Sequence, residues 1–173
     1  MNLHLDWCDY RAAKYAVEHW HYSHTMPASK RLLIGVWEDK IFKGVIIFTS
    51  GAGAAANGQQ YGLRQNFDMV ELQRIALTTH ESTVSRMVSI AIRILKQKCP
   101  RLRMIVSYSD PREGHHGGIY QAGNWVYVDT TSSVTEYELS NGRWVHKRTI
   151  SKQWGRYELA HSLVTGSQTC VSS

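Results

Sequence analysis

Residues 69–108 read MVELQRIALTTHESTVSRMVSIAIRILKQKCPRLRMIVSY, and their pattern decides the fold. Residues 69–78 place apolar side chains at strand spacing, which predicts a strand. Residues 103–108 form a shorter run whose Met-Ile-Val centre predicts a strand buried on both faces. The two strands enclose a segment with a different periodicity.

That segment predicts the longest helix of the chain. Ser82 or Thr83 can cap its start, and Cys99-Pro100 ends it after about Gln97. Its apolar residues form one stripe along a helical surface: Val84, Met87, Val88, Ala91, Ile94 and Leu95. The pattern is typical of an amphipathic helix.

The N-terminal third predicts a helix and a hairpin. Residues 10–22 carry apolar residues three to four apart, with Pro27 just beyond them. Arg31–Glu38 and Phe42–Phe48 are rich in aliphatic and aromatic residues, and the short Asp39-Lys40 turn separates them. This order predicts helix, strand, turn and strand.

The C-terminal part predicts smaller elements. They are a short helix over Gly117–Ala122, a strand over Trp125–Val128, a hairpin of Val134–Leu139 with Trp144–Arg148, and weak helix over Ile150–Leu163. A polar tail follows from Thr165. The order predicts one α+β domain over residues 1–173, with a central mixed, mostly antiparallel sheet flanked by helices.

Composition narrows the class of partner. The 173 residues include 20 Lys and Arg against 14 Asp and Glu, a net charge of +6, which favours phosphate-bearing partners. The three cysteines form no CxxC pair, so neither a disulfide framework nor a structural zinc site is expected. Without a membrane-length apolar run or a signal-peptide pattern, a soluble intracellular protein is expected.

Ionisable residues gather in the loop from Ser107 to Trp125. Asp110 precedes a proline, which pushes it towards extended backbone, so its carboxylate can project from the preceding strand end. With His115 and with His21 from elsewhere, it can form the two-histidine, one-carboxylate set typical of non-haem Fe(II) sites. Tyr120 is an acid or hydrogen-bond donor, or part of the core.

A second cluster surrounds the start of the long helix. Arg74, Ser82, Ser85 and Arg86 predict an anion site there, because a helix N-terminus attracts phosphate. Glu71 and Arg74 are three residues apart on one strand, so they are expected on opposite faces. An ordinary buried ion pair and a solvated arginine are the simpler interpretations.

The C-terminal half is basic and aromatic, which suits contact with a nucleic acid backbone and stacking on an unstacked base. An ordinary basic hairpin has the same composition. The residues concerned are Arg101, Arg103, Arg143, Lys147, Arg148, Lys152 and Arg156, interleaved with Trp144, Trp154 and Tyr157.

The order of elements resembles the Gcn5-related N-acetyltransferase superfamily. That resemblance implies that the strand before the long helix and the start of that helix hold the pyrophosphate of acetyl-CoA or a related acyl-CoA. The glycine-rich loop usual in the superfamily is missing here, because residues 78–83 read TTHEST.

A closer resemblance is to the Mom DNA-modification proteins of Mu-like bacteriophages, over roughly residues 20–128. Its motifs are His21-Tyr22-Ser23 with Pro27, Gly44-Val45-Ile46-Ile47-Phe48, Glu71-Leu72-Gln73-Arg74-Ile75-Ala76-Leu77, Ser85-Arg86, Ser107-Tyr108-Ser109-Asp110 with Gly114-His115, and Ile119-Tyr120-Gln121-Ala122-Gly123-Asn124-Trp125. Each motif is short, and their order and spacing together are specific.

The resemblance implies an enzyme that converts adenine in double-stranded DNA to an N6-carbamoylmethyl derivative in the host cytoplasm and so protects DNA from restriction. It also implies iron, Fe2+, and suggests an acyl-CoA donor. His21, Asp110 and Tyr120 take the positions expected to matter for activity. His21, Asp110 and His115 are the expected iron ligands, and whether His115, His116 or Tyr120 completes the site stays open.

Two other functions are compatible with the residues. An acetyl-CoA-dependent N-acetyltransferase of a small amine or protein fits the predicted fold and anion site. A non-catalytic DNA-binding module fits the charge, but leaves His21, Asp110 and His115 unexplained. The sequence leaves open the donor, the DNA target sequence and the oligomeric state, a homodimer included.

Overall fold

The computed structural model describes residues 2–29, 31–50, 61–64, 68–109, 117–127, 134–139, 144–146 and 164–170. Contacts within the chain divide it into two compact units. The first comprises residues 1–108 and 117–126, and the second comprises residues 109–116 and 127–173.

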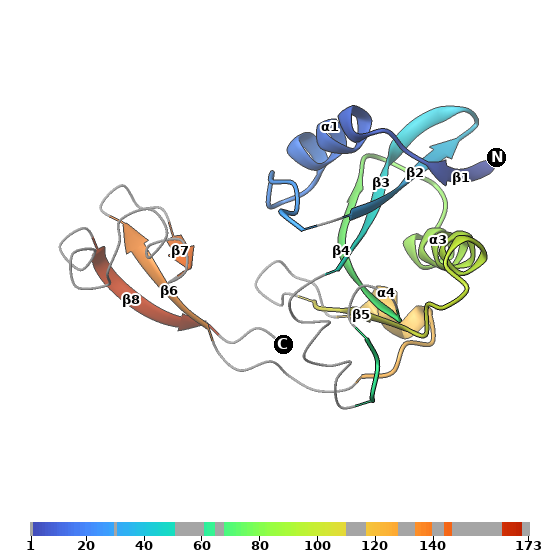
Figure 1. Ribbon diagram of the computed structural model, residues 1–173. Coiled ribbons are helices and arrows are strands. Elements are labelled where there is room, and N and C mark those ends of the chain that lie inside the picture. The colour runs from blue at the N-terminus through green and yellow to red at the C-terminus, as the bar shows by residue number, and fades with distance from the viewer. Residues whose placement is uncertain are drawn as a thin grey trace. The chain divides into compact units, whose positions relative to one another are not determined.

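The first unit contains a five-stranded sheet in the order β1-β2-β3-β4-β5 (Figure 1). The strands are β1 (Leu3–Trp7), β2 (Arg31–Glu38), β3 (Ile41–Thr49), β4 (Met69–Leu77) and β5 (Met104–Ser107). Neighbouring strands pair antiparallel, except β4 and β5, which are parallel. This confirms the α+β class and the mixed, mostly antiparallel sheet.

Within the described residues, three helices accompany the sheet: α1 (Tyr10–Trp20), α3 (Val84–Lys98) and α4 (Gly118–Ala122). All three match predicted helices. The Asp9 side chain caps α1 by accepting the N–H groups of Arg11 and Ala12 at 2.8 and 2.9 Å. Thr83 is the N-cap of α3, without a side-chain capping bond. In the described residues, no helix has the length and apolar character required to span a membrane.

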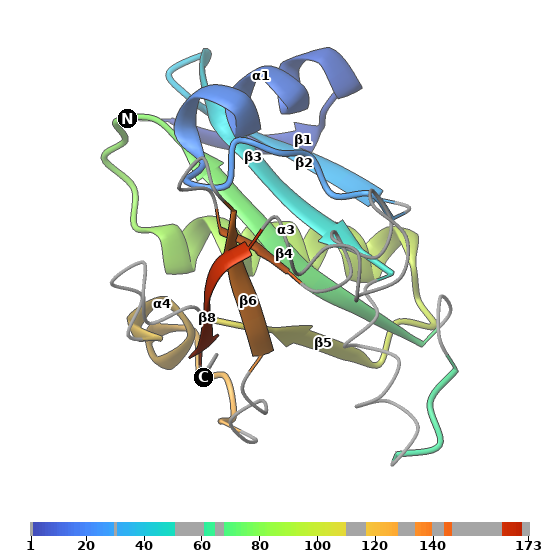
Figure 2. The same cartoon turned by 90° about the vertical axis from the view of Figure 1, so that its left-hand side faces the viewer.

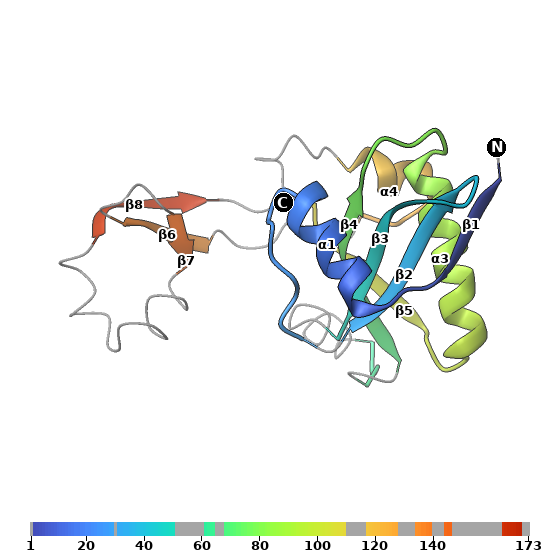
Figure 3. The ribbon, with the colours of Figure 1, turned by 90° about the horizontal axis from the view of Figure 1, so that it is seen from above.

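The sheet has a core on each face, because successive strand side chains point to opposite sides. Figure 3 shows α1 and α3 on opposite sides of the sheet. The cluster beneath α3 contains Leu5, Ile34, Val36, Ile46, Phe48, Leu72, Met87, Val88, Ala91, Leu95 and Leu102. The cluster beneath α1 contains Ala13, Ala16, Val17, Val45, Ile47 and Ala76.

The parallel pair β4 and β5 separates halfway along β4. Pairing runs from Met69–Met104 to Leu72–Ser107 and stops there, while β4 continues to Leu77 (Figure 2). At the same level, the register between β3 and β4 shifts: Phe48 pairs with Leu72, but Ile47 pairs with Arg74. Gln73 is therefore the extra residue of a β-bulge, which bends a strand and redirects its side chains.

Two predictions for β5 and the segment after α4 are wrong. Residues 125–127 form no strand, and Val126 and Tyr127 are 85% and 76% exposed. An apolar run alone does not make a strand when no neighbouring strand pairs with it. The side chains of β5 are half-buried rather than buried on both faces, in agreement with its place at the sheet edge.

The second unit contains a three-stranded antiparallel sheet in the order β7-β6-β8. Its strands are β6 (Val134–Leu139), β7 (Trp144–His146) and β8 (Val164–Cys170). The predicted hairpin is confirmed as β6 and β7. Strand β8 occupies the stretch from Thr165 that its composition marks as a polar tail, and the predicted weak helix over 150–163 lies outside the described residues.

Candidate functional site

The bulge at Gln73 brings Glu71 and Arg74 to one face of the sheet. Thr49 pairs with Glu71, and Ile47 pairs with Arg74. Thr49 and Ile47 are two residues apart on β3, so they and their partners share the face covered by α1. The prediction that Glu71 and Arg74 point to opposite faces is therefore wrong, because the extra residue restores their alignment.

Both residues carry charge in a partly dry environment. Glu71 is 8% exposed, and burial raises the pKa of its carboxyl group, while the charge of Arg74 acts in the opposite direction. Nη1 of Arg74 donates to the Gln73 carbonyl at 2.9 Å. Among the described residues, buried Nε of Arg74 and buried Oε1 of Gln73 have no hydrogen-bond partner.

His21 ends α1 and is 6% exposed. Its Nδ1 lies 2.8 Å from Ser23 Oγ and accepts the Ser23 backbone N–H at 3.1 Å. A backbone N–H can only donate, so this bond places the ring proton on Nε2. Binding of iron through Nε2 would require the opposite tautomer and the loss of that bond.

The other predicted metal ligands, Asp110 and His115, lie outside the described residues, as does His116. In the part of the chain that the structure describes, no group of three His, Cys, Asp or Glu side chains could hold a metal ion. The three-ligand set thus stays a prediction.

Tyr120 is anchored on the core. Its hydroxyl lies 2.7 Å from Ser107 Oγ, and Ser107 Oγ donates to the Leu72 carbonyl at 2.8 Å. Because serine has one hydroxyl proton, Tyr120 is the donor to Ser107. Burial raises the pKa of Tyr120, and its ring packs edge-on against Trp125. Tyr120 contacts the cluster beneath α3, whereas His21 ends the helix on the opposite face.

A carboxylate fills the turn between β4 and α3. Glu38, at the end of β2, accepts the N–H of Ser82 at 2.7 Å and the N–H of Glu81 at 3.0 Å. These bonds, led by the one from Ser82, lower the pKa of Glu38. Glu38 is 4% exposed, so its carboxylate is a buried, structural part of this turn.

This turn does not fit the pyrophosphate of an acyl-coenzyme A. Two of its N–H groups already bind an internal anion, and Glu81 adds a second carboxylate to the same turn. Ser85 and Arg86 lie on the first turn of α3, where Arg86 is exposed, whereas Arg74 lies on the α1 face. The structure thus separates Arg74 from the other three residues of the predicted anion site.

The predicted basic surface lies mostly outside the described residues. Arg101 and Arg103 are exposed between α3 and β5, and Trp144 begins β7. The remaining residues of that prediction are not described: Arg143, Lys147, Arg148, Lys152, Arg156, Trp154 and Tyr157. Their role in binding DNA stays a prediction.

Gln73, Ser107 and Glu38 gain roles that the sequence did not assign. Nothing in a single sequence marks Gln73 as a bulge residue, and the bonds of Ser107 and Glu38 join residues 35 and 44 positions apart. The sequence signal that did exist was the polar triplet Glu71, Gln73 and Arg74 within an otherwise apolar strand.

Comparison with known proteins shows the family of the chain. The model of the Mom protein family matches residues 2–169. The protein named methylcarbamoylase mom of Escherichia phage Mu is 27% identical over 133 residues, which cover 76% of this chain and 54% of that protein. The chain thus spans about half the length of this relative. Because the family model matches nearly the whole chain, the chain belongs to the Mom protein family.

Proposed function

We propose that this chain is a DNA-modifying enzyme that converts adenine to N6-carbamoylmethyl adenine and so protects DNA from restriction. Membership of the Mom protein family supports modification of DNA adenine. The relative's name, methylcarbamoylase, supports the group transferred. N6 is paired inside a duplex, so the target base flips out of double-stranded DNA into the enzyme.

The observation that carries this proposal is the match of the Mom family model to residues 2–169, and a pair of orphaned atoms at the bulge supports recognition of adenine. Gln73 Oε1 is a buried acceptor and Arg74 Nε a buried donor, each without a partner in the described residues. An unmet buried polar group costs about 1–3 kcal/mol, so a base that reaches both atoms when the covering side chains move gains affinity. Adenine offers an N6 amino donor next to an N7 acceptor, the complement of this pair.

Arg74 is held for this role by its own backbone neighbour. Its Nη1 is bonded to the Gln73 carbonyl, which restrains the guanidinium. In the proposed complex, Nε donates to N7 and Gln73 Oε1 accepts from the N6 amino group. The second N6 hydrogen faces the reaction, in which N6 displaces the leaving group from the methylene carbon of a carbamoylmethyl donor. The N6–carbon bond forms, the bond from that carbon to the leaving group breaks with its electron pair, and N6 gives up a proton.

One described group is a candidate for taking that proton. Burial raises the pKa of Glu71, and a base works best when its pKa lies near the working pH. We assign the proton to Glu71 and propose that His21 and Asp110 act beside it. Tyr120, which packs on the other face of the sheet, takes part through its hydrogen bond to Ser107.

His21, Asp110 and His115 are the residues that would hold an iron ion. A bound iron ion supplies Lewis acid or redox chemistry at the carbon that joins N6. In that role Nε2 of His21 would bind the iron once the ring proton lies on Nδ1, where Ser23 Oγ can accept it. An acyl-coenzyme A is the weaker candidate for the donor, because Glu38 occupies the turn that would hold its pyrophosphate. For the same reason an ordinary acetyltransferase is the weaker alternative.

Restriction protection tests the assignment of the bulge. Plasmid DNA from cells that express the full chain is digested with nucleases whose sites contain adenine. The Gln73→Met variant removes the orphaned acceptor at similar volume. We expect protection to fall at least about tenfold while the melting temperature stays equal or rises, because a buried unmet group has been removed.

Gln97→Met is the matched control, since Gln97 is exposed on α3 and the chemical change is the same. It should protect DNA as well as the wild type does. Full protection by Gln73→Met would contradict the role of the bulge in recognising adenine. Absence of protection by the soluble wild-type chain would contradict the proposed function itself.

A further inference from the structure

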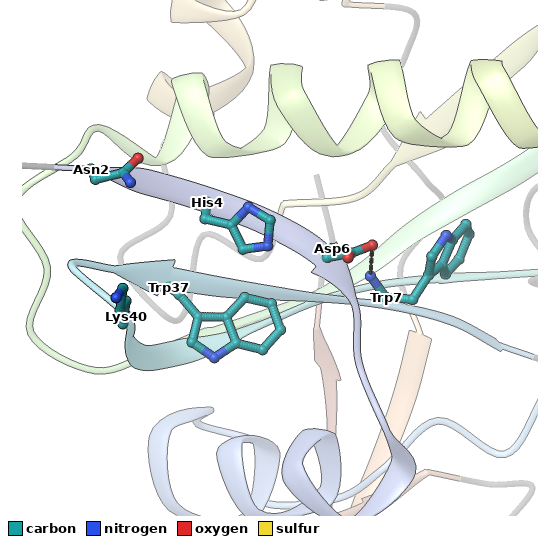
Figure 4. Close-up of a pocket in the computed structure, with 6 residues that line it drawn as sticks. All are labelled: Asn2, His4, Asp6, Trp7, Trp37 and Lys40. Carbon is teal, nitrogen blue, oxygen red and sulfur yellow. Dashed lines mark hydrogen bonds between the residues drawn. The ribbon is translucent and has the colours of Figure 1, made fainter.

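A pocket of about 580 Å³ lies on strands β1 and β2, at the edge of the sheet opposite to β5. It is lined by Asn2, His4, Asp6, Trp7, Trp37 and Lys40 (Figure 4). Its volume is within the range of small-molecule sites. The proposed function uses none of these residues.

Two aromatic rings, tilted against each other, line the pocket. His4 pairs with Trp37 across the two strands, and their ring centroids lie 5.8 Å apart at an angle of 42°. The indole lies close over Gly35, where an added Cβ would come within 2.4 Å of it. Phe42 supports the indole with a ring centroid at 5.5 Å. Trp37 is thus fixed as a stacking platform.

Polar groups lie along the same strand pair. Asp6 accepts the Trp7 N–H at 2.8 Å, which fixes its carboxylate at the end of β1. His4 and Asp6 are two residues apart, so they share a face and lie about 7 Å from each other. Lys40 follows at the hairpin turn, where Asp39 accepts the Asn2 N–H. Figure 4 shows Lys40, the His4–Trp37 rings and Asp6 in a row.

These groups have unused binding capacity. Within the described residues, the Lys40 ammonium and the His4 ring nitrogens have no hydrogen-bond or ion-pair partner, and one Asp6 oxygen is likewise unbonded. A cation, a pair of rings and a carboxylate in a row match the phosphate, base and exocyclic amine of one nucleotide. An alkyl chain would leave both charges unmet.

We propose that this pocket binds one unstacked nucleotide of a DNA strand, with an amino-bearing base on Trp37. Asp6 accepts from the exocyclic amine, and Lys40 binds the phosphate. The site goes beyond the proposed function because it is a second contact with DNA, separate from the β4 bulge. The choice of DNA as the source of the nucleotide rests on the proposed function.

Binding of labelled single-stranded oligonucleotides to the purified full chain tests this inference, measured by fluorescence anisotropy at several salt concentrations. Oligo(dA) and oligo(dC) should bind several-fold more tightly than oligo(dT), because thymine has no exocyclic amine. Equal affinity for all three would overturn the inference. So would binding of free dAMP as tight as that of oligo(dA), since the nucleotide would then not come from DNA.

Variants assign the contacts. Asp6→Asn should reduce the preference for oligo(dA) over oligo(dT), and His4→Ala should weaken all oligonucleotides about tenfold through lost stacking. Lys40→Asn suits the left-handed backbone at φ 69° and should lower the salt dependence by about one ion. Lys14→Ala, an exposed lysine on α1, is the control and should bind as the wild type does.

This readout is separate from modification. If these variants bind normally while adenine is modified, the pocket inference fails and the proposed function stands. If they bind weakly while adenine in cells stays unmodified, the proposed function fails and the pocket inference stands.

Discussion

Glu71 and Arg74 lie on the same face of the sheet, although they are three residues apart on β4. The cause is the single extra residue Gln73, at the level where β4 also separates from β5. A regular strand would have placed one of the two charges in the core beneath α3. The bulge instead places the Glu71 carboxyl group and the Arg74 guanidinium, with its unmet Nε, on the face covered by α1.

Glu71 should make stability depend on pH. Burial raises its folded-state pKa, so the folded chain holds this proton to higher pH than the unfolded chain does. The contribution is fully present below the ordinary value of 4.5 and is lost as pH rises through the folded-state pKa. Urea unfolding of Glu71→Gln should show a smaller loss of stability over that range. An unchanged pH profile, with exposed Glu18→Gln as control, would contradict the account.

Glu38 should make stability depend on pH in the opposite direction to Glu71. Bonds from Ser82 and Glu81 lower its folded-state pKa, so its stabilising contribution is present above 4.5 and is lost as pH falls through the folded-state pKa. Glu38→Gln should lower the melting temperature at neutral pH and weaken its decline in acid. Thermal unfolding from neutral to acidic pH measures both effects. A variant as stable as the wild type would show that the turn holds its shape without this carboxylate.

Tyr120, Ser107 and the Leu72 carbonyl form a chain of two hydrogen bonds, so substitutions at Tyr120 and Ser107 should lower the free energy of unfolding by different amounts. Tyr120→Phe removes one donor and should cost about 1 kcal/mol of unfolding free energy. Ser107→Ala removes the hydroxyl between the two bonds and leaves the phenol and the Leu72 carbonyl unmet, so it should cost more, about 1–3 kcal/mol. Chemical unfolding of both variants checks the order. The reverse order would mean that Tyr120 does not depend on Ser107.

Gly44 tests the close approach of β3 to β4. Its φ is 140°, and an added Cβ would lie 1.9 Å from the Ala76 carbonyl oxygen. Gly44→Ala should therefore destabilise the chain by about 3 kcal/mol, from backbone strain and overpacking together. Gly118→Ala is the control, since an added Cβ there meets nothing within 4 Å. Similar melting temperatures for the two variants would contradict the register of β3 and β4.

Periodicity predicted the elements that bury a continuous apolar stripe or surface. The helix α3 and the hairpin β2–β3 were of this kind. Strand β1 was not predicted, because in Leu3–Trp7 only Leu5 is fully buried. Strand β8 is polar throughout much of its length and carries no alternation. Such strands form through pairing with their neighbours, which local sequence does not encode.

The candidate site was predictable by residue type and less so by arrangement. The sequence indicated His21, Arg74 and Tyr120, and the structure gives each a defined setting. Only the folded sheet shows that Tyr120 packs beneath α3, and only the register shift shows that Arg74 shares a face with Glu71. Asp110 and His115 lie outside the described residues.

Mass spectrometry of nucleosides tests the central claim most directly. DNA is isolated from cells that express the soluble full chain with iron supplied, and is digested to nucleosides. We predict an N6-carbamoylmethyl derivative of deoxyadenosine, absent when Asp110→Ala replaces the wild type in a folded protein. An adenine pool that stays entirely unmodified with the soluble wild-type chain would contradict the account.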